Sequence, residues 1–342
     1  MNSRERVAAA MKYQKPDKVP VEYLCTPVGY YEHGEKLNDL YATLPGDFGP
    51  FERRPIPLLG PELFDMNGKY HEFRRDDWGI LWEYRIYGIA GIPYERPLED
   101  LSKVYDFKFP EPPKAVGERF ETDLAAGKIH REQYYHQYHC GSLFERLREL
   151  CLDEDVYCEM AEDSKEINYL ADKIAEYDRA KVEYAVALGA DGVSFGDDYG
   201  TERALITSPE MWRRFFKPRL KYIFEPAVKA GMTVHFHSCG QIRPIIEDLA
   251  DVGATSIWPQ LPAYDMADLA KLSRGTGLAI AIHTDRANTM TFGTPQQVRD
   301  LVKREYETFK MADGGSWFYI ESDNGFPFEN LEALVNTVKE IR

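Results

Sequence analysis

The regular alternation of predicted strands and helices after residue 133 is the feature that most constrains the fold of this chain. The predicted strands are 134–139, 191–196, 233–237, 255–258, 278–283 and 317–321. The predicted helices are 143–152, 153–188, 209–229, 242–250, 266–272, 295–311 and 329–341. Strands and helices that alternate in this way form a parallel sheet with the helices packed outside it.

Two earlier strands, 18–24 and one near 63–66, bring the count to about eight, the number that closes a (β/α)8 barrel. We therefore predict an α/β fold in which residues 1–342 form a single (β/α)8 TIM barrel domain. An N-terminal extension is expected to form a helix over 3–12. Residues 25–132 are expected to contain long loops and insertions, including an early hairpin over 77–88. An open doubly wound sheet is the alternative, but it usually carries a glycine-rich phosphate loop after its first strand, and none is visible.

Composition and charge exclude several functional classes. The chain has 57 acidic and 42 basic residues, a net charge of −15, and no basic block. This argues against nucleic acid and against anionic membrane surfaces as partners. The five scattered cysteines indicate reduced thiols and a cytoplasmic location, and no segment is predicted to span a membrane.

Polar side chains follow most of the predicted strands, at the end of a barrel where active sites lie. They are His139-Cys140, Asp197-Asp198, His237-Ser238-Cys239, Trp258-Pro259-Gln260, His283-Thr284-Asp285 and Glu321-Ser322-Asp323. Each has a structural alternative, because Asp197 or Asp198 could cap the next segment and His283 could be a hydrogen-bonded histidine beneath a loop. The repetition of His, Cys, Asp and Glu on strand after strand favours a functional site.

His237 and Cys239 are the most specific pair in this set. They are two residues apart at a strand end, so their side chains point to the same side, and imidazole with thiolate suits Zn²⁺. The alternative is a hydrogen-bonded histidine beside a small buried cysteine. Glu321 is the predicted third metal ligand, because it follows apolar residues and a desolvated carboxylate is tolerated when it binds a cation. Asp323 is the alternative third ligand.

A set of short segments spread over nearly the whole chain carries a resemblance to a known family. The segments include Arg4-Glu5-Arg6-Val7, Asp77-Trp78-Gly79, Asp197-Asp198-Tyr199-Gly200, His237-Ser238-Cys239-Gly240 and Phe292-Gly293-Thr294-Pro295. Together they resemble the uroporphyrinogen decarboxylase superfamily, which includes corrinoid-dependent methyltransferases. The resemblance implies a (β/α)8 barrel, in agreement with the strand count.

The resemblance also separates two kinds of chemistry. The decarboxylases carry an arginine- and glycine-rich motif that binds the carboxylates of the substrate, but the corresponding segment here, 26–32, contains no arginine. The methyltransferase branch holds zinc through a His-x-Cys pair and a late cysteine. His237 and Cys239 match the pair, whereas no cysteine follows Cys239, so the resemblance implies a zinc site in which a carboxylate such as Glu321 replaces the late thiolate.

The implied activity is transfer of a methyl group between a small methylated substrate and a corrinoid carried by a separate partner protein. Zinc would act as a Lewis acid, and a carboxylate ligand makes the metal harder, which favours an O-methyl substrate. The candidate catalytic residues are Asp197, Asp198 and His283. The candidate substrate-binding residues are Tyr30, Trp78, Tyr199 and Trp258, with core packing as the alternative for each.

Two functions from other classes also fit the sequence. One is a metal-free decarboxylase of the uroporphyrinogen decarboxylase type, with Asp197 or Asp198 as acid or base. The other is a non-catalytic binding barrel that has lost its third metal ligand. Retention of zinc by the purified protein would distinguish the methyltransferase from both.

Overall fold

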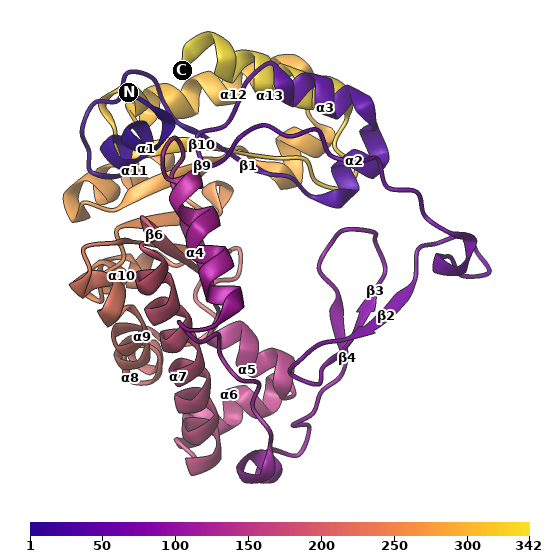
Figure 1. Ribbon diagram of the computed structural model, residues 1–342, viewed down its shortest axis with the longest axis vertical. Helices are drawn as coiled ribbons and strands as arrows, with labels where there is room; N and C mark the ends of the chain where they lie inside the picture. Colours follow the sequence, from indigo (N-terminus) through magenta and orange to yellow (C-terminus); the bar gives the residue numbers. More distant parts are fainter.

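The computed structural model describes residues 1–342 and is built around one seven-stranded parallel sheet (Figure 1). Its strands are β1 (Val21–Leu24), β5 (Gln137–Gly141), β6 (Gly192–Gly196), β7 (Thr233–Ser238), β8 (Ser256–Pro259), β9 (Ala279–His283) and β10 (Ser316–Glu321). The order is β1-β10-β9-β8-β7-β6-β5, so each strand from β5 onward pairs with the next one in the chain. The predicted α/β fold with a parallel sheet is confirmed.

The helices of the chain lie around this sheet, most of them on its outside (Figure 1). They are α1 (Ser3–Met11), α2 (Pro27–His33), α3 (Glu35–Ala42), α4 (Glu118–His130), α5 (Phe144–Leu150), α6 (Asp153–Glu162), α7 (Lys165–Leu188), α8 (Pro209–Phe215), α9 (Lys217–Lys229), α10 (Ile246–Asp251), α11 (Met266–Thr276), α12 (Pro295–Thr308) and α13 (Phe328–Ile341). Alternate strand residues such as Phe195, Phe236 and Ile282 belong to the large core beneath these helices. None of the helices has the combination of length and apolar composition needed to cross a bilayer.

The other face of the sheet is turned inward and forms a second, smaller core. Ala281, Trp317 and Tyr319 from neighbouring strands pack there with Val7 and Met11 of α1. Because strand side chains alternate between faces, the residues that continue these inward rows, such as His283 and Glu321, belong to the same side. The inner face therefore carries apolar side chains near α1 and polar ones toward the strand ends.

The sheet lacks the eighth strand that we predicted near residues 63–66. Pro61–Leu63 is a short 3₁₀ helix, and Phe64 pairs with Tyr70 only in an isolated bridge. Pro61 is the first residue of this helix, and a proline cannot donate to a ladder of strand hydrogen bonds. The sequence pattern overestimated the strand content of this part of the chain.

Asp47 lies in the position between the two edges of the sheet. Its backbone N–H donates to the carbonyl of Val21 (2.7 Å), and its carbonyl accepts from the N–H of Tyr135 (3.4 Å), two residues before β5. Its buried carboxylate accepts from Arg6 of α1 (2.5 Å) and from Arg342 (2.8 Å). A single residue with its two ion pairs therefore links β1, the start of β5, α1 and the last helix.

The early insertion is a separate three-stranded antiparallel sheet, β2 (Glu72–Arg75), β3 (Leu81–Tyr84) and β4 (Ile92–Glu95). The hairpin predicted over 77–88 is thus displaced, because residues 76–80 form the turn between β2 and β3. Figure 1 shows this sheet standing away from the parallel sheet, between α2 and α5. Tyr87 contacts Tyr31 of α2 (ring centroids 5.6 Å), and Trp78 contacts Tyr177 of α7 (ring centroids 5.0 Å). The insertion therefore packs against the rest of the chain at two places.

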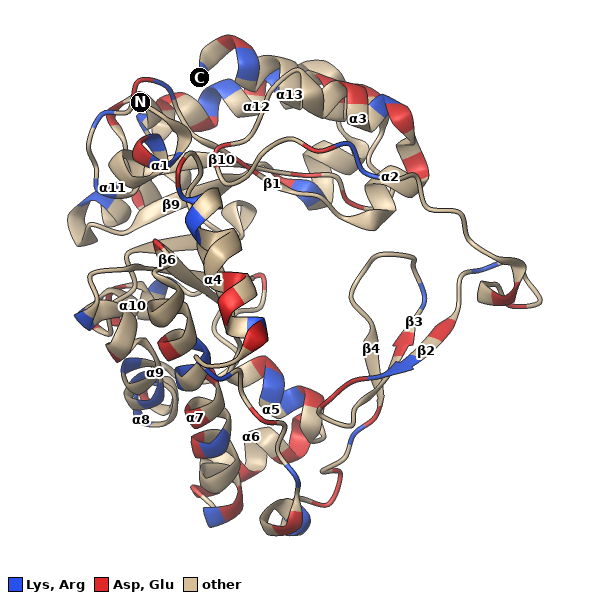
Figure 2. Cartoon of the chain, in the orientation of Figure 1, with Lys and Arg blue, Asp and Glu red and all other residues tan.

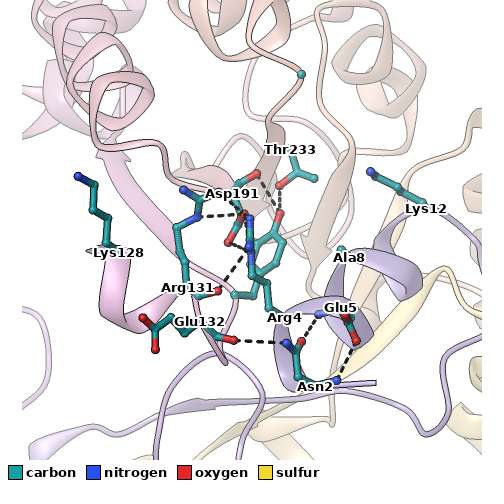
Figure 3. Close-up of a pocket in the computed structure, with 12 residues that line it drawn as sticks. Asn2, Arg4, Glu5, Ala8, Lys12, Lys128, Arg131, Glu132, Asp191 and Thr233 are labelled. Atoms are coloured by element: carbon teal, nitrogen blue, oxygen red, sulfur yellow. Dashed lines mark hydrogen bonds and ion pairs between the residues drawn. The ribbon is translucent and has the colours of Figure 1, made fainter. Parts of the chain in front are cut away.

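A polar cavity of about 610 Å³ lies at the end of the sheet where the strands begin (Figure 3). Arg4 of α1 donates to both carboxylate oxygens of Asp191, and Arg131 also approaches that carboxylate at 3.3 Å. Thr233, the first residue of β7, lines the cavity, so the cavity lies at the opposite end of β7 from His237.

Figure 2 shows Lys and Arg scattered among Asp and Glu over the helices, in agreement with the absence of a basic block.

Glu305 of α12 is a buried carboxyl group that supports the end of β9. It is only 1% exposed and accepts a hydrogen bond from the hydroxyl of Thr284, the residue after the strand (2.8 Å). Burial raises the pKa of Glu305 to about 8, against the opposing effect of the Thr284 hydrogen bond. The folded protein therefore keeps a proton here that the unfolded chain releases near pH 4.5.

We predict that Glu305→Gln weakens the pH dependence of stability. Between about pH 5 and pH 8 the folded state holds one more proton at this site than the unfolded state, so its contribution to the unfolding free energy falls as pH rises, by at most about 1.4 kcal/mol per pH unit. Glutamine keeps the shape and removes the titration. Urea unfolding of both proteins at pH 5 to 8 measures the difference, and parallel curves would contradict the prediction.

Candidate functional site

Three side chains that could hold a metal ion lie together at the ends of β6 and β7. They are Asp198, two residues after β6, and His237 and Cys239 at the end of β7, with ligand atoms that all lie within 4.8 Å of one another. His237 Nε2 is 3.4 Å from Cys239 Sγ and 3.5 Å from Asp198 Oδ1. The same-side geometry predicted for His237 and Cys239 is therefore present, and the carboxylate beside them is that of Asp198.

Two glycines allow this approach. Gly240 has φ +73°, a left-handed conformation that favours glycine, and a Cβ on Gly240 would collide with the backbone of Gly200. With the two backbones in contact, Gln241 N–H donates to the carbonyl of Thr201 (2.7 Å) and Cys239 N–H donates to Asp198 Oδ1 (2.8 Å). The loops after β6 and β7 are thereby joined, and Asp198 is held against the His237–Cys239 pair.

The hydrogen bonding of His237 leaves one ring nitrogen free for a ligand. Its Nδ1–H donates to the backbone carbonyl of Trp258 at 2.9 Å, so the lone pair of Nε2 faces Cys239 and Asp198. Burial lowers the pKa of His237, although the charge of Asp198 opposes this effect. A buried imidazole with Nδ1 fixed by a carbonyl is the form in which histidine binds metals.

Cys239 fits a metal site for a related reason. Burial, reinforced by the charge of Asp198, raises the pKa of the Cys239 thiol to about 12. A thiol in this setting becomes a thiolate when a cation compensates its charge. Nitrogen, sulfur and carboxylate oxygen together are a donor set that Zn²⁺ accepts, so the residues present fit this ion.

Asp197 and Asp198 point in different directions, although both are candidate catalytic residues in the sequence. Asp197 is 1% exposed and lies on the helix-facing side of the sheet. Its carboxylate accepts the backbone N–H groups of Leu143, Phe144 and Glu145 at the start of α5, and the hydroxyl of Tyr199. Asp197 therefore caps a helix in the core, whereas Asp198 faces the strand ends.

His283 and Glu321 form a neighbouring group. His283 Nε2 is 3.2 Å from Glu321 Oε2, and His283 Nδ1 accepts a hydrogen bond from the indole N–H of Trp258 (3.2 Å). Burial raises the pKa of Glu321, but His283 and Arg286 lower it further, so the net shift is downward. Glu321 and Asp198 thus lie in separate groups, and the structure groups Asp198 rather than Glu321 with His237 and Cys239.

Arg286 is a site residue that the sequence reasoning missed. Its guanidinium lies 2.5 Å from Asp323 and 3.8 Å from Glu321, and it supplies the positive partner that β10 itself lacks. Arg286 begins a π-helical turn (Arg286–Met290), a feature frequently found at functional sites. The only sequence signal for this turn is Asp285, whose side chain caps it.

The four aromatic candidates lie in different surroundings. Trp258 lines a cavity of about 320 Å³ together with His237, Cys239, His283 and Arg286. Tyr199 is packed between Phe144 and Phe236 on the helix side of the sheet, and Trp78 is buried against Tyr177. Tyr30 lines a separate cavity of about 210 Å³ beside β1, with Glu22 and Cys25. Only Trp258 adjoins the candidate metal site.

Comparisons with known proteins agree with this geometry at the level of the fold. Residues 153–341, more than half of the chain, match the family described as uroporphyrinogen decarboxylase (URO-D). No curated protein matches the chain in sequence. A methyltransferase from Methanosarcina mazei has a similar structure, with a TM-score of 0.66, 17% identity and 99% of each chain covered.

Two further solved structures are less similar. Dihydropteroate synthase from Anaplasma phagocytophilum has a TM-score of 0.36 and 17% identity, over 52% of this chain and 69% of that one. The dihydropteroate synthase from Thermus thermophilus has a TM-score of 0.33 and 16% identity, over 60% of this chain and 67% of that one. Scores this low carry no argument about function.

We predict that the two adjacent aspartates have separable roles. Asp197→Ala leaves three backbone N–H groups of α5 without their acceptor and should lower the unfolding free energy by about 3 kcal/mol. Asp198→Ala removes a half-exposed carboxylate and should cost less than about 1 kcal/mol. Urea unfolding of the two variants and the unmodified chain measures both effects, and equal losses would contradict the assignment.

Proposed function

The chain belongs to the uroporphyrinogen decarboxylase family, and we propose that within this family it is a zinc-dependent methyltransferase. It would move a methyl group between a small methylated substrate and a corrinoid carried by a partner protein. The observation that carries the proposal is the cluster of His237 Nε2, Cys239 Sγ and an Asp198 carboxylate oxygen within 4.8 Å of one another. The fold-level similarity to a methyltransferase from Methanosarcina mazei is consistent with it.

Asp198 is favoured as the third metal ligand. Its carboxylate lies beside the His237–Cys239 pair, whereas Glu321 faces His283 and Asp323 faces Arg286. Glu321, the ligand expected from the sequence, remains the alternative, because its Oε2 atom is buried and forms no hydrogen bond of good geometry. Variants of both carboxylates distinguish the two assignments.

The surrounding residues would prepare the site for a small substrate. Bound Zn²⁺ supplies Lewis acidity that stabilises negative charge on the atom that loses the methyl group. Trp258 fixes Nε2 of His237 toward the ligand position, and Asp198 holds the backbone of Cys239 in place. Pro259, Leu261 and Pro262 give the 320 Å³ cavity an apolar wall.

The charges around the cavity argue against decarboxylation of a porphyrinogen. Arg286 is the only lysine or arginine that lines the cavity, and Asp323 and Glu321 already neutralise it. A substrate with several carboxylates would find no free cation there. An uncharged O-methyl compound suits this environment better, and a zinc ion with one thiolate and one carboxylate ligand favours oxygen.

We predict that the purified protein binds about one zinc per chain and that Cys239→Ser and Asp198→Asn each remove most of it without unfolding the protein. Cys158→Ser, which changes an exposed thiol on α6, is the matched control and should keep its zinc. Elemental analysis and a chromophoric chelator measure content and affinity. If Asp198→Asn keeps full affinity while Glu321→Gln loses about ten-fold or more, the third ligand is Glu321. Full zinc content in Cys239→Ser would exclude the site.

We also predict transfer of a methyl group to a reduced corrinoid. Incubation of the zinc-loaded protein with Co(I) cobalamin and a panel of small methyl ethers should convert the Co(I) absorption spectrum to that of methyl-Co(III). Cys239→Ser should abolish the conversion. Release of CO₂ from a carboxylated substrate by the metal-free protein, with no methyl transfer to cobalt, would favour the decarboxylase instead. Tight ligand binding without either reaction would favour the non-catalytic barrel.

A further inference from the structure

The side chain of Trp258 lies between the candidate metal site and the His283–Glu321 group. In the sheet, Trp258 is paired with His237 of β7, and β9, which carries His283, lies on its other side. The indole packs against the His237 ring (centroids 4.0 Å) on one side and against Tyr319 (4.2 Å) on the other. Both neighbours restrict the rotation of the indole and therefore the position of the imidazole beside it.

Trp258 contacts the two histidines through different groups. Its backbone carbonyl accepts the Nδ1–H of His237 (2.9 Å), and its indole N–H donates to Nδ1 of His283 (3.2 Å). An indole nitrogen can only donate, so Nδ1 of His283 is the acceptor and the ring carries its proton on Nε2. That Nε2 faces Glu321 Oε2 at 3.2 Å.

Both nitrogens of His283 therefore face groups of the protein: Nδ1 accepts from the indole of Trp258, and Nε2 lies 3.2 Å from Glu321 Oε2 without a hydrogen bond of good geometry. Neither is free to bind a metal or to take a proton from a substrate unless the contact with Trp258 or with Glu321 is broken. Glu321 is 6% exposed, and its other charged neighbour, Arg286, lies farther away at 3.8 Å. The donors point in one direction: His237 Nδ1–H donates to the Trp258 carbonyl, the indole N–H of Trp258 donates to His283, and the Nε2 of His283 faces Glu321.

We propose that His283 and Glu321 are positioning residues that hold the indole of Trp258, and through it the imidazole of His237, in the orientation needed for metal binding. This inference rests on the proposed metal site but assigns His283 and Glu321 different roles from those expected from the sequence. A metal-binding histidine commonly depends on such supporting contacts, and their loss weakens metal affinity by about ten- to a hundred-fold. Here the support would act through the packed indole of Trp258.

The test measures Zn²⁺ and Co²⁺ affinity by competition with a chromophoric chelator. Glu321→Gln, His283→Leu and Trp258→Phe should each weaken affinity about ten-fold, and His283→Gln should recover part of the loss because an amide can both accept and donate. The double variant Glu321→Gln/His283→Leu should be no weaker than His283→Leu, since both residues act along one path. Asp323→Asn is the matched control, because it removes a charge next to Arg286 but does not contact His283.

The absorption spectrum of the Co²⁺ form separates positioning from direct ligation. One thiolate, Cys239, should give one sulfur-to-cobalt charge-transfer band, and Glu321→Cys should not increase its intensity. A band that doubles in Glu321→Cys would show that position 321 reaches the metal and would overturn the inference. Unchanged affinity in His283→Leu, or additive losses in the double variant, would also overturn it while leaving the metal site intact. An unmodified protein that binds neither ion would overturn both proposals.

Discussion

The buried carboxylate of Asp47 is the constraint on which the architecture depends. Seven parallel strands curl toward each other but leave a gap between β1 and β5, and Asp47 makes one backbone hydrogen bond to each side of it. Arg6 and Arg342 balance its charge in a place where an unpaired carboxylate would be costly. One residue thus ties the first strand, α1 and the end of the last helix together.

The site itself follows from the order of the strands. Because β6, β7, β8, β9 and β10 are consecutive neighbours, Asp198, His237, Trp258, His283 and Glu321 arise from one strand end after another along the same edge. The close contact of Gly200 with Gly240 then moves the loops after β6 and β7 together. The result is two adjoining polar groups. Asp198, His237 and Cys239 are suited to a metal, whereas Glu321 is paired with His283 and Arg286.

The sequence predicted the parts of this arrangement that depend on local periodicity. The strand spacing of two residues correctly placed His237 and Cys239 on one side, and the strand–helix alternation correctly predicted the parallel sheet. Adjacent residues of a strand point to opposite sides, but the sequence could not show which of the two aspartates takes which side. In the structure Asp197 faces α5 and Asp198 faces the strand ends. The helix predicted over 209–229 is broken into α8 and α9 at Phe216, where Pro218 cannot supply the hydrogen bond of a continuous helix. The sequence did not indicate Arg286, because this residue lies in a loop and its partners, Glu321 and Asp323, belong to another strand end.

The pairing of β1 with β10 has a consequence for how the protein is made. Val21 lies opposite Phe318, so the first strand has no neighbour until the last strand has left the ribosome. At ~5–20 residues per second, synthesis of the intervening segment takes roughly 15 to 60 s. Strands β5 to β9 can pair in order of emergence during that time, while β1 waits with an open edge. Closure of the two ends is therefore a late, long-range step, and until then β1 presents an unpaired edge of the kind that can pair with other chains.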